Sequence, residues 1–353
     1  MSQLWSPAVQ SLTPYIPGEQ PTERVIKLNT NENPYPPAPG VGETLRKFAS
    51  DHLRLYPDPA SMALRSELAR CYGVDPRQVF VGNGSDEVLA FAFQAFFCHG
   101  EPLDAPSITY SFYPVYARLY GIELRQHPLT PEWEVDLEAL SQPQPRSGVI
   151  FANPNAPTGH THSLDALESL LQKVTDRVVL VDEAYVDFGT ESAVTLIERY
   201  PNLLVTSTFS KSRSLAGLRL GFAIGSAELI EGLERIKDSF NSYPVDSLAS
   251  AVGIAALKDS DHFAACREKV ITTRERTRHQ LETLGFEVLP SQANFLLTQH
   301  PNHDGAQLFA GLRERGILVR HFNKAGLGNF LRITIGTDDE MDYLIEALQA
   351  MVR

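Results

Sequence analysis

One lysine of the sequence stands where it could do covalent chemistry. Lys211 lies between Ser210 and Ser212, directly after a short apolar run. A lysine among small hydroxyl residues at the end of a strand can form a Schiff base with an aldehyde. Arg219, eight residues further on, has a planar guanidinium that suits a phosphate group. Taken alone, these residues are equally compatible with a solvated lysine and arginine on a loop.

A carboxylate ends a second apolar run. The residues 178–181 are all valine or leucine, and Asp182 follows them. Ligands of open α/β sheets bind at the carboxyl ends of the strands, and a buried carboxylate there needs a cationic partner. A protonated ring nitrogen would provide that partner, and Tyr185 could donate to a phenolic oxygen of the same ring. The alternative is an aspartate that caps a helix after a core strand.

Two turns could place backbone amides over the same site. Gly84, Ser85 and Asp86 follow the apolar residues 79–81 and begin a helix, so their N–H groups would point at an anion. The spacing is neither that of a dinucleotide fold nor that of a P-loop, so it predicts a phosphate without a nucleotide. An ordinary helix cap is the alternative. The second turn, residues 153–159, contains Asn155 between two prolines, and it could also be only a turn.

The motifs lie among helices that alternate with short apolar strands. We expect strands at residues 79–81, 148–152, 178–181, 203–206 and 220–224, and helices at 65–71, 86–97 and 164–172. Strands that are apolar throughout and alternate with helices indicate an α/β fold, in which a mostly parallel sheet is covered by helices on both faces.

The pattern changes after residue 229. We expect helices at 229–240, at 262–284 and from 338, and strands at 286–289, 295–298, 317–320 and 331–335, which together form a smaller α+β unit. Residues 1–40 are rich in proline and asparagine, which favours an extended arm that joins the small domain. The predicted division is therefore an arm at 1–40, a large cofactor domain at 41–243 and a small domain at 244–353.

The order of these motifs resembles that of the fold-type I pyridoxal-phosphate-dependent aminotransferases. Within that family the histidinol-phosphate aminotransferases are the most similar, and the resemblance covers nearly the whole chain. It is carried by residues 14–15, 31–34, 56–58, 82–87, 154–159, 182–185, 210–221, 294–295 and 331–334. The resemblance implies a transaminase with pyridoxal 5′-phosphate as its cofactor.

The resemblance also implies a role for each matching residue. Lys211 would form the Schiff base and move a proton, Asp182 would hold the pyridine nitrogen, and Tyr185 would hold the phenolic oxygen. Tyr110 would stack on the ring. The cofactor phosphate would be bound by Gly84, Ser85, Asp86, Ser210 and Arg219. Tyr56 would reach that phosphate from the partner subunit of a homodimer.

The substrate-binding residues implied by the resemblance lie at the two ends of the chain. Arg320 and Arg332 would bind the anionic end of the substrate, and Tyr15 would close over it from the arm. One position departs from the family pattern, because the asparagine expected directly before Pro-Thr-Gly is Ala156 here, and Asn155 precedes it. Either Asn155 swings in to bind the cofactor, or Tyr185 acts alone.

The implied reaction moves an amino group from histidinol phosphate to 2-oxoglutarate, a step of histidine biosynthesis. An aromatic amino-acid aminotransferase and a threonine-phosphate decarboxylase use the same machinery, so the arginines do not separate these alternatives. A cofactor-binding regulator would add a DNA-binding domain before the fold. About 40 residues precede it here, too few for such a domain of ordinary size.

The composition of the chain limits the kinds of molecule that it could bind. The net charge is −12, and there is no run of basic residues, which argues against nucleic acid and anionic membranes as partners. No stretch has the length of a membrane span, and residues 1–10 do not resemble a signal peptide. The three cysteines have no metal-site spacing, and we expect no metal and a cytoplasmic location.

Overall fold

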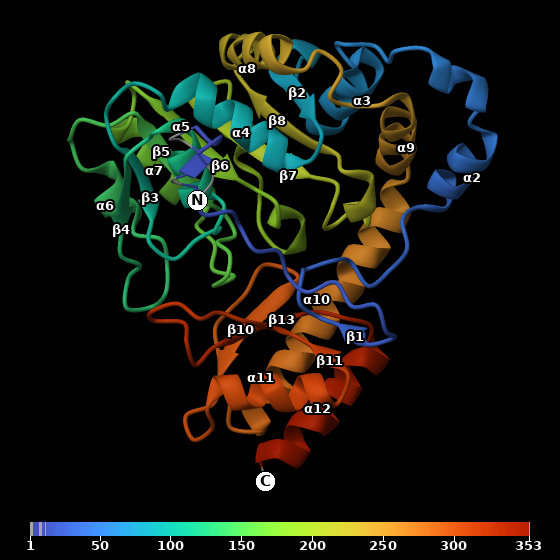
Figure 1. Cartoon of the computed structure of the whole chain (residues 1–353), viewed down its shortest axis with the longest axis vertical. Coiled ribbons are helices and arrows are strands. Elements are labelled where there is room, and N and C mark those ends of the chain that lie inside the picture. Colours follow the sequence, from blue (N-terminus) through green and yellow to red (C-terminus); the bar gives the residue numbers. More distant parts are fainter. Residues whose placement is uncertain (1–2, 7–8, 11, 353) are drawn as a thin grey trace.

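The computed structural model describes residues 3–6, 9–10 and 12–352, which form a larger and a smaller body (Figure 1). The larger body is built on a seven-stranded sheet with the strand order β2-β8-β7-β6-β5-β3-β4. Its strands are β2 (Val79–Gly82), β3 (Leu103–Pro106), β4 (Leu124–His127), β5 (Gly148–Ala152), β6 (Val178–Asp182), β7 (Leu203–Thr208) and β8 (Gly221–Gly225). In the described sheet β8 runs antiparallel to β2 and β7, and the other neighbouring strands pair in parallel, so the expected mostly parallel sheet is confirmed.

Helices cover both faces of this sheet, as the apolar strands predict. Within β5, Ile150 packs on one face, and Val149 and Phe151 pack on the other. The first face is covered by α4 (Ser85–Phe96), α5 (Tyr113–Tyr120) and α8 (Ala227–Phe240), and the second by α3 (Met62–Tyr72), α6 (Leu137–Ser141), α7 (Leu164–Lys173) and α9 (Ser247–Lys258). Adjacent strand residues face opposite sides, so a strand that is buried on both sides must be apolar throughout.

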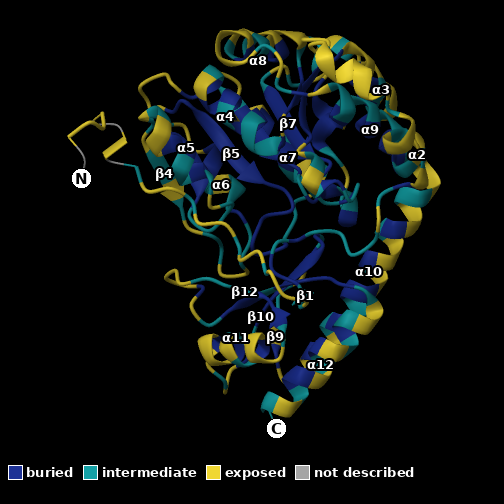
Figure 2. Cartoon of the chain, turned by 45° about the vertical axis from the view of Figure 1, so that its right-hand side comes forward, coloured by how far each residue is buried: buried dark blue, intermediate teal, exposed yellow. Residues whose placement is uncertain are grey.

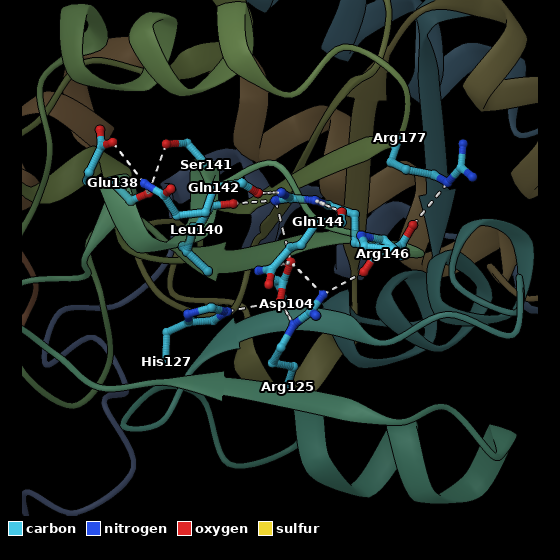
Figure 3. Close-up of polar contacts among 11 residues, drawn as sticks. Asp104, Arg125, His127, Glu138, Leu140, Ser141, Gln142, Gln144, Arg146 and Arg177 are labelled. Atoms are coloured by element: carbon cyan, nitrogen blue, oxygen red, sulfur yellow. Dashed lines mark hydrogen bonds and ion pairs between the residues drawn. The ribbon is translucent and has the colours of Figure 1, made fainter.

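The edge pair β3–β4 lies outside the strands expected from the sequence because it contains charged residues. The carboxylate of Asp104 is fully buried in β3, and Arg125 and His127 of β4 contact it at 2.5 Å and 2.9 Å (Figure 3). Arg146 approaches the same carboxylate at 3.4 Å. A buried charge is tolerated where it is paired and hydrogen-bonded. This polar cluster therefore replaces the apolar pattern at this edge.

The smaller body holds a four-stranded antiparallel sheet and a short parallel pair. The sheet has the order β12-β13-β10-β9, formed by Arg320–His321, Leu331–Thr334, Phe295–Gln299 and Glu287–Val288. The pair joins β1 (Ile26–Lys27) of the arm to β11 (Ile317–Leu318). The single strand expected at 317–320 is thus wrong, because β11 pairs with the arm while β12 pairs with β13.

Three helices complete this body. They are α10 (Ser260–Thr283), α11 (Gly305–Glu314) and α12 (Asp338–Val352). The helix α10 runs from the larger body into the smaller one, and its buried residues lie along one side (Figures 1 and 2). Among the described helices none is both long and apolar enough to cross a membrane.

The division into domains at residues 40 and 243 stays a prediction. The pairing of β1 with β11 supports an arm that belongs to the small body. The helix α9 packs in the core of the large body through Ala249, Val252 and Ala256, and α2 (Pro39–Lys47) packs against it. This packing favours a change from the large to the small body beyond α9.

Candidate active site

The sequence motifs meet in an inner cavity of about 150 Å³ at the carboxyl ends of β6 and β7. Its walls come from the arm, the start of α4, the end of β6 and the segment after β7. The lining includes Thr30, Glu32, Ser85, Asp86, Tyr110, Ala156, Asp182, Tyr185, Ser210, Lys211 and Arg219. Most residues expected to contact the cofactor therefore lie around one space.

One end of the inner cavity has the features of a phosphate site. The helix α4 begins there, with Gly84 as its N-cap at φ 85°. A Cβ atom on Gly84 would lie 2.6 Å from the guanidinium of Arg219, and one on Gly221 would lie 2.2 Å from the amide nitrogen of Ser85. Glycine at both positions thus allows Arg219 and β8 to approach the helix N-terminus, where backbone N–H groups favour an anion.

The carboxylate of Asp86 is already engaged at this end. It accepts a hydrogen bond of 2.8 Å from the hydroxyl of Tyr110 and pairs with Arg219 at 3.0 Å. The side chain of Asp86 therefore orients Tyr110 and Arg219. That its backbone N–H points at an anion, together with those of Gly84 and Ser85, stays a prediction.

Asp182 is 4% exposed at the end of β6. Its carboxylate accepts hydrogen bonds from the hydroxyl of Tyr113 at 3.0 Å and from the amide of Ala184 at 3.2 Å. Burial raises its pKa to about 6, against the lowering effect of these hydrogen bonds. In the described part of the chain no basic side chain pairs with it, so the site suits a cationic ligand atom.

Lys211 reaches back toward the arm. Its ammonium nitrogen donates to the carbonyl of Thr30 at 2.9 Å. Burial and, to a smaller extent, the nearby charge of Arg332 lower the pKa of Lys211 to about 8, against the opposing effect of Glu32. A lysine with such a pKa is partly neutral near physiological pH, as a nucleophile or proton acceptor must be.

Tyr185 is held by an arm residue, Asn31, and the sequence did not predict this contact. The side-chain amide of Asn31 donates to the hydroxyl of Tyr185 at 2.9 Å. Asn31 has a left-handed backbone with φ 57°, and Thr334 fixes it from β13. Tyr113 was likewise not assigned to the site from the sequence, although its hydroxyl donates to Asp182. For both residues the sequence shows only a polar side chain near apolar residues. The direction of that side chain cannot be predicted from the spacing.

Three residues expected to bind the cofactor do not line the inner cavity within one chain. One is Gly84, which directly precedes the lining residue Ser85, and the other two are Asn155 and Tyr56. Asn155 is buried, and its amide donates to the carbonyl of Ile108 and to the hydroxyl of Thr158, both at 3.1 Å. Tyr56 is 82% exposed and stacks on Tyr243 with ring centroids 4.7 Å apart. Neither residue lines the inner cavity.

An outer cavity of about 710 Å³ adjoins the inner one and shares Lys211, Tyr110 and Arg219 with it. The arm lines it at Tyr15, and the small body lines it at Arg320 and Arg332. Its basic side chains are Arg118, Lys211, Arg219, Arg320, Lys324 and Arg332, against the single carboxylate of Asp86. In a chain of net charge −12, this is a concentrated site for anions.

Arg332 is an enclosed cation of the outer cavity. Its guanidinium donates to the carbonyl of Asn29 at 2.9 Å and lies 5.3 Å and 5.6 Å from the rings of Phe295 and Phe322. Burial lowers its pKa from the ordinary arginine value. The cost of burying this cation is compensated in part by the aromatic faces, and an anionic ligand would compensate it further.

Comparison with known proteins identifies the fold and the machinery. The family model described as aminotransferase class I and II matches residues 23–348. The chain belongs to this family. It is 67% identical to a histidinol-phosphate aminotransferase of Chromohalobacter salexigens, over 100% of both chains, and 54% identical to one of Pseudomonas syringae pv. syringae, over 99% of both.

A solved structure has the same architecture. The histidinol-phosphate aminotransferase of Sinorhizobium meliloti, determined in complex with pyridoxal-5′-phosphate, superposes with a TM-score of 0.89 at 26% identity and covers 100% of this chain and 98% of that one. This chain is a pyridoxal-phosphate-dependent aminotransferase of fold type I. Three features of the site fit that cofactor. The close approach at Gly84 and Gly221 to the start of α4 suits its phosphate. The Asp182 carboxylate suits its ring nitrogen, and the partly neutral Lys211 suits its aldehyde.

Proposed function

We propose that this aminotransferase transfers the amino group of histidinol phosphate to 2-oxoglutarate. The observation that carries this assignment is the charge of the outer cavity, where six basic side chains face one carboxylate. Arginine and lysine clusters of this kind bind phosphate monoesters and carboxylates by charge-assisted hydrogen bonds. The donor brings a phosphate, and the acceptor brings two carboxylates.

The bound cofactor supplies an electron sink for the substrate's amine-bearing carbon. The chain supplies everything else. Lys211 takes the proton from that carbon and later returns one, as its pKa of about 8 permits at neutral pH. Asp182 is the counter-charge for the pyridine nitrogen, and Asn31 orients the hydroxyl of Tyr185 toward the inner cavity.

The remaining roles follow from position. Tyr110 lines both cavities and is oriented by Asp86, so it stacks on the cofactor ring. The cofactor phosphate is bound by Gly84, Ser85, Asp86, Ser210 and Arg219. Tyr15 covers the substrate from the arm, where its ring packs on that of Phe112 with centroids 4.4 Å apart. Arg320 and Arg332 bind the substrate's anionic end.

We assign a homodimer in which Tyr56 completes the partner's site. Large apolar side chains around Tyr56 are exposed, including Leu53, Phe240 and Tyr243. Exposed apolar side chains gathered in this way mark a protein interface, and two-fold dimers are the commonest symmetric assembly. Among the residues that the structure describes in one chain, the ring of Tyr56 stacks on that of Tyr243, and Tyr56 does not line the inner cavity.

A cytoplasmic location and small-molecule ligands complete the proposal. All three cysteines are free thiols in the structure, in keeping with a reducing compartment. The negative net charge opposes binding to nucleic acid or anionic membranes.

A substrate panel tests the proposed reaction. With 2-oxoglutarate as acceptor, kcat/KM should be higher for histidinol phosphate than for phenylalanine or tyrosine. Arg320→Ala should lower the value for histidinol phosphate by more than for the aromatic acids, about tenfold for a lost charge-assisted contact. A preference for tyrosine or phenylalanine would identify an aromatic aminotransferase, and carbon dioxide release from threonine phosphate would identify a decarboxylase.

A further inference from the structure

We infer that Lys324 is a specificity-determining residue that binds the donor's phosphate while it fastens the loop 322–330 across the outer cavity. The inference rests on the proposed function and deepens it, because it names a residue that distinguishes a phosphorylated donor from one without phosphate. Lys324 lines the outer cavity only, so it acts on the part of the substrate remote from the inner cavity.

The loop 322–330 joins β12 to β13 in the small body and crosses to the large one. The ammonium of Lys324 donates to the carbonyl of Ser107, just after β3, at 2.7 Å. An added Cβ on Gly326 would lie 3.7 Å from the side chain of Ile108, and the rings of Phe330 and Trp133 meet edge to face at 4.9 Å. These contacts join the two bodies at the rim of the substrate space.

The polar end of Lys324 has capacity for a ligand. An ammonium has three N–H donors, and the carbonyl of Ser107 uses one of them. In the described part of the chain no carboxylate forms an ion pair with Lys324. Although much of the residue is exposed, partial burial of its ammonium lowers the pKa of Lys324. An anion in the outer cavity would offset that cost.

Two other cations of the outer cavity already have partners within the chain. Arg219 is paired with Asp86, and Arg332 donates to the carbonyl of Asn29. Arg320 lies two residues before the loop, with its guanidinium 5.8 Å from the ring of Phe322. Lys324 therefore adds a third positive charge to the two arginines of the small body. A phosphate dianion gains more from that third charge than a neutral hydroxyl does.

Paired donors test the inference. In the holoenzyme, kcat/KM is measured for histidinol phosphate and for histidinol, which lacks only the phosphate, with Lys324→Met, Lys324→Gln and Lys324→Arg. We expect Met and Gln to lower the value for histidinol phosphate about tenfold more than the value for histidinol, mainly through KM. Arg should retain most of the preference. Lys47→Met, an exposed lysine on α2, is the control for loss of one charge.

Inorganic phosphate as a competitive inhibitor gives an independent measure, with whichever donor the wild-type enzyme accepts. Its inhibition constant should rise about tenfold in Lys324→Met and stay unchanged in Lys47→Met. Equal losses of kcat/KM for both donors would show that Lys324 only holds the loop in place, and would overturn the inference. An unchanged inhibition constant of phosphate would also overturn it. If the wild-type enzyme rejects histidinol phosphate, the proposed function fails, whereas the phosphate inhibition still decides the role of Lys324.

Discussion

The inner and outer cavities are built in different ways. The inner cavity lies at the ends of strands of one sheet, and its reactive groups follow β6, β7 and the start of α4. The outer cavity needs the arm, the loop 322–330 and the side of the large body, which are far apart in sequence. The reactive groups of the inner cavity thus come mainly from one edge of the large sheet, with arm residues beside them, whereas selectivity depends on how two bodies and the arm come together.

The two cavities also differ in their electrostatics. In the inner cavity, burial displaces the pKa values of Asp182 and Lys211 in the directions that favour neutral groups. The outer cavity instead gathers positive charge, and its rim is partly exposed. We expect substitutions in the inner cavity to lower kcat and substitutions in the outer cavity to raise KM.

Removing Lys211 should have the largest effect. Lys211→Ala is expected to lower kcat by at least about 10⁴-fold, because no other amine lines the inner cavity to move the proton. Turnover and the visible absorption of the bound cofactor measure it, with the exposed Lys173→Ala as a control. Borohydride should fix the cofactor to the peptide that contains Lys211 in the wild-type enzyme. A label on any other lysine would contradict the assignment.

Asp182→Asn should come next. The variant keeps the shape of the side chain and its acceptor for Tyr113, but the ring nitrogen loses its counter-charge. We expect cofactor to bind and kcat to fall by about 10²–10³-fold, as for other positioned electrostatic groups. Tyr113→Phe, which leaves the carboxylate but removes its hydroxyl donor, should cost less. Near-normal turnover of Asp182→Asn would mean that another residue holds the ring.

The contrast between the cavities also explains what the sequence could predict. Apolar runs ending in Asp182 or followed by Lys211 indicate strand ends, and parallel strand ends converge on one edge, so the inner cavity was predictable. Tyr113 and Asn31 were not, because the direction of a side chain depends on packing between elements. Strands with charged residues, such as β3 and β4, were not predicted either, because the partners of Asp104 come together only after folding.

The pKa of Lys211 can be measured without the cofactor. In the apoenzyme its amine should titrate at about pH 8, which leaves roughly 10²-fold more neutral amine at neutral pH than an ordinary lysine has. Because the folded state gives up its proton first, this group should make folding more favourable as pH rises from about 8 to about 10. The pH dependence of acylation of Lys211 tests this. A midpoint near 10 would show that the amine is not desolvated.

Substitution of Tyr56 tests whether the active site is complete in one chain. Tyr56→Ala should lower activity about 10- to 100-fold, the cost of one charge-assisted hydrogen bond. Mixed with Lys211→Ala, it forms dimers in which one site carries both lesions and the other carries neither. About a quarter of wild-type activity should return, since half of randomly mixed dimers are mixed and each has one intact site. Mixed dimers without recovered activity would show that Tyr56 acts within its own chain.

Asn155 should give the smallest effect, and it directly precedes Ala156, which lines both cavities. Its amide holds the carbonyl of Ile108, which lines the outer cavity, and the hydroxyl of Thr158. Asn155→Ala should therefore destabilise the fold by about 1–3 kcal/mol and raise the KM of the donor a few-fold, while the visible absorption of the cofactor stays unchanged. Thr158→Val, which removes one of the two partners, should reproduce part of the loss of stability.

The spectrum distinguishes this role from the one that the family pattern suggests. If Asn155 donated to the phenolic oxygen of the cofactor, its removal would shift the visible absorption band and change the pH at which that band titrates. The structure instead places Ala156 at the inner cavity and Asn155 behind it. A shifted band in Asn155→Ala with an unchanged melting temperature would show that Asn155 contacts the cofactor and does not merely support Ile108. An unshifted band with a lower melting temperature would leave Tyr185, held by Asn31, as the group at the phenolic oxygen.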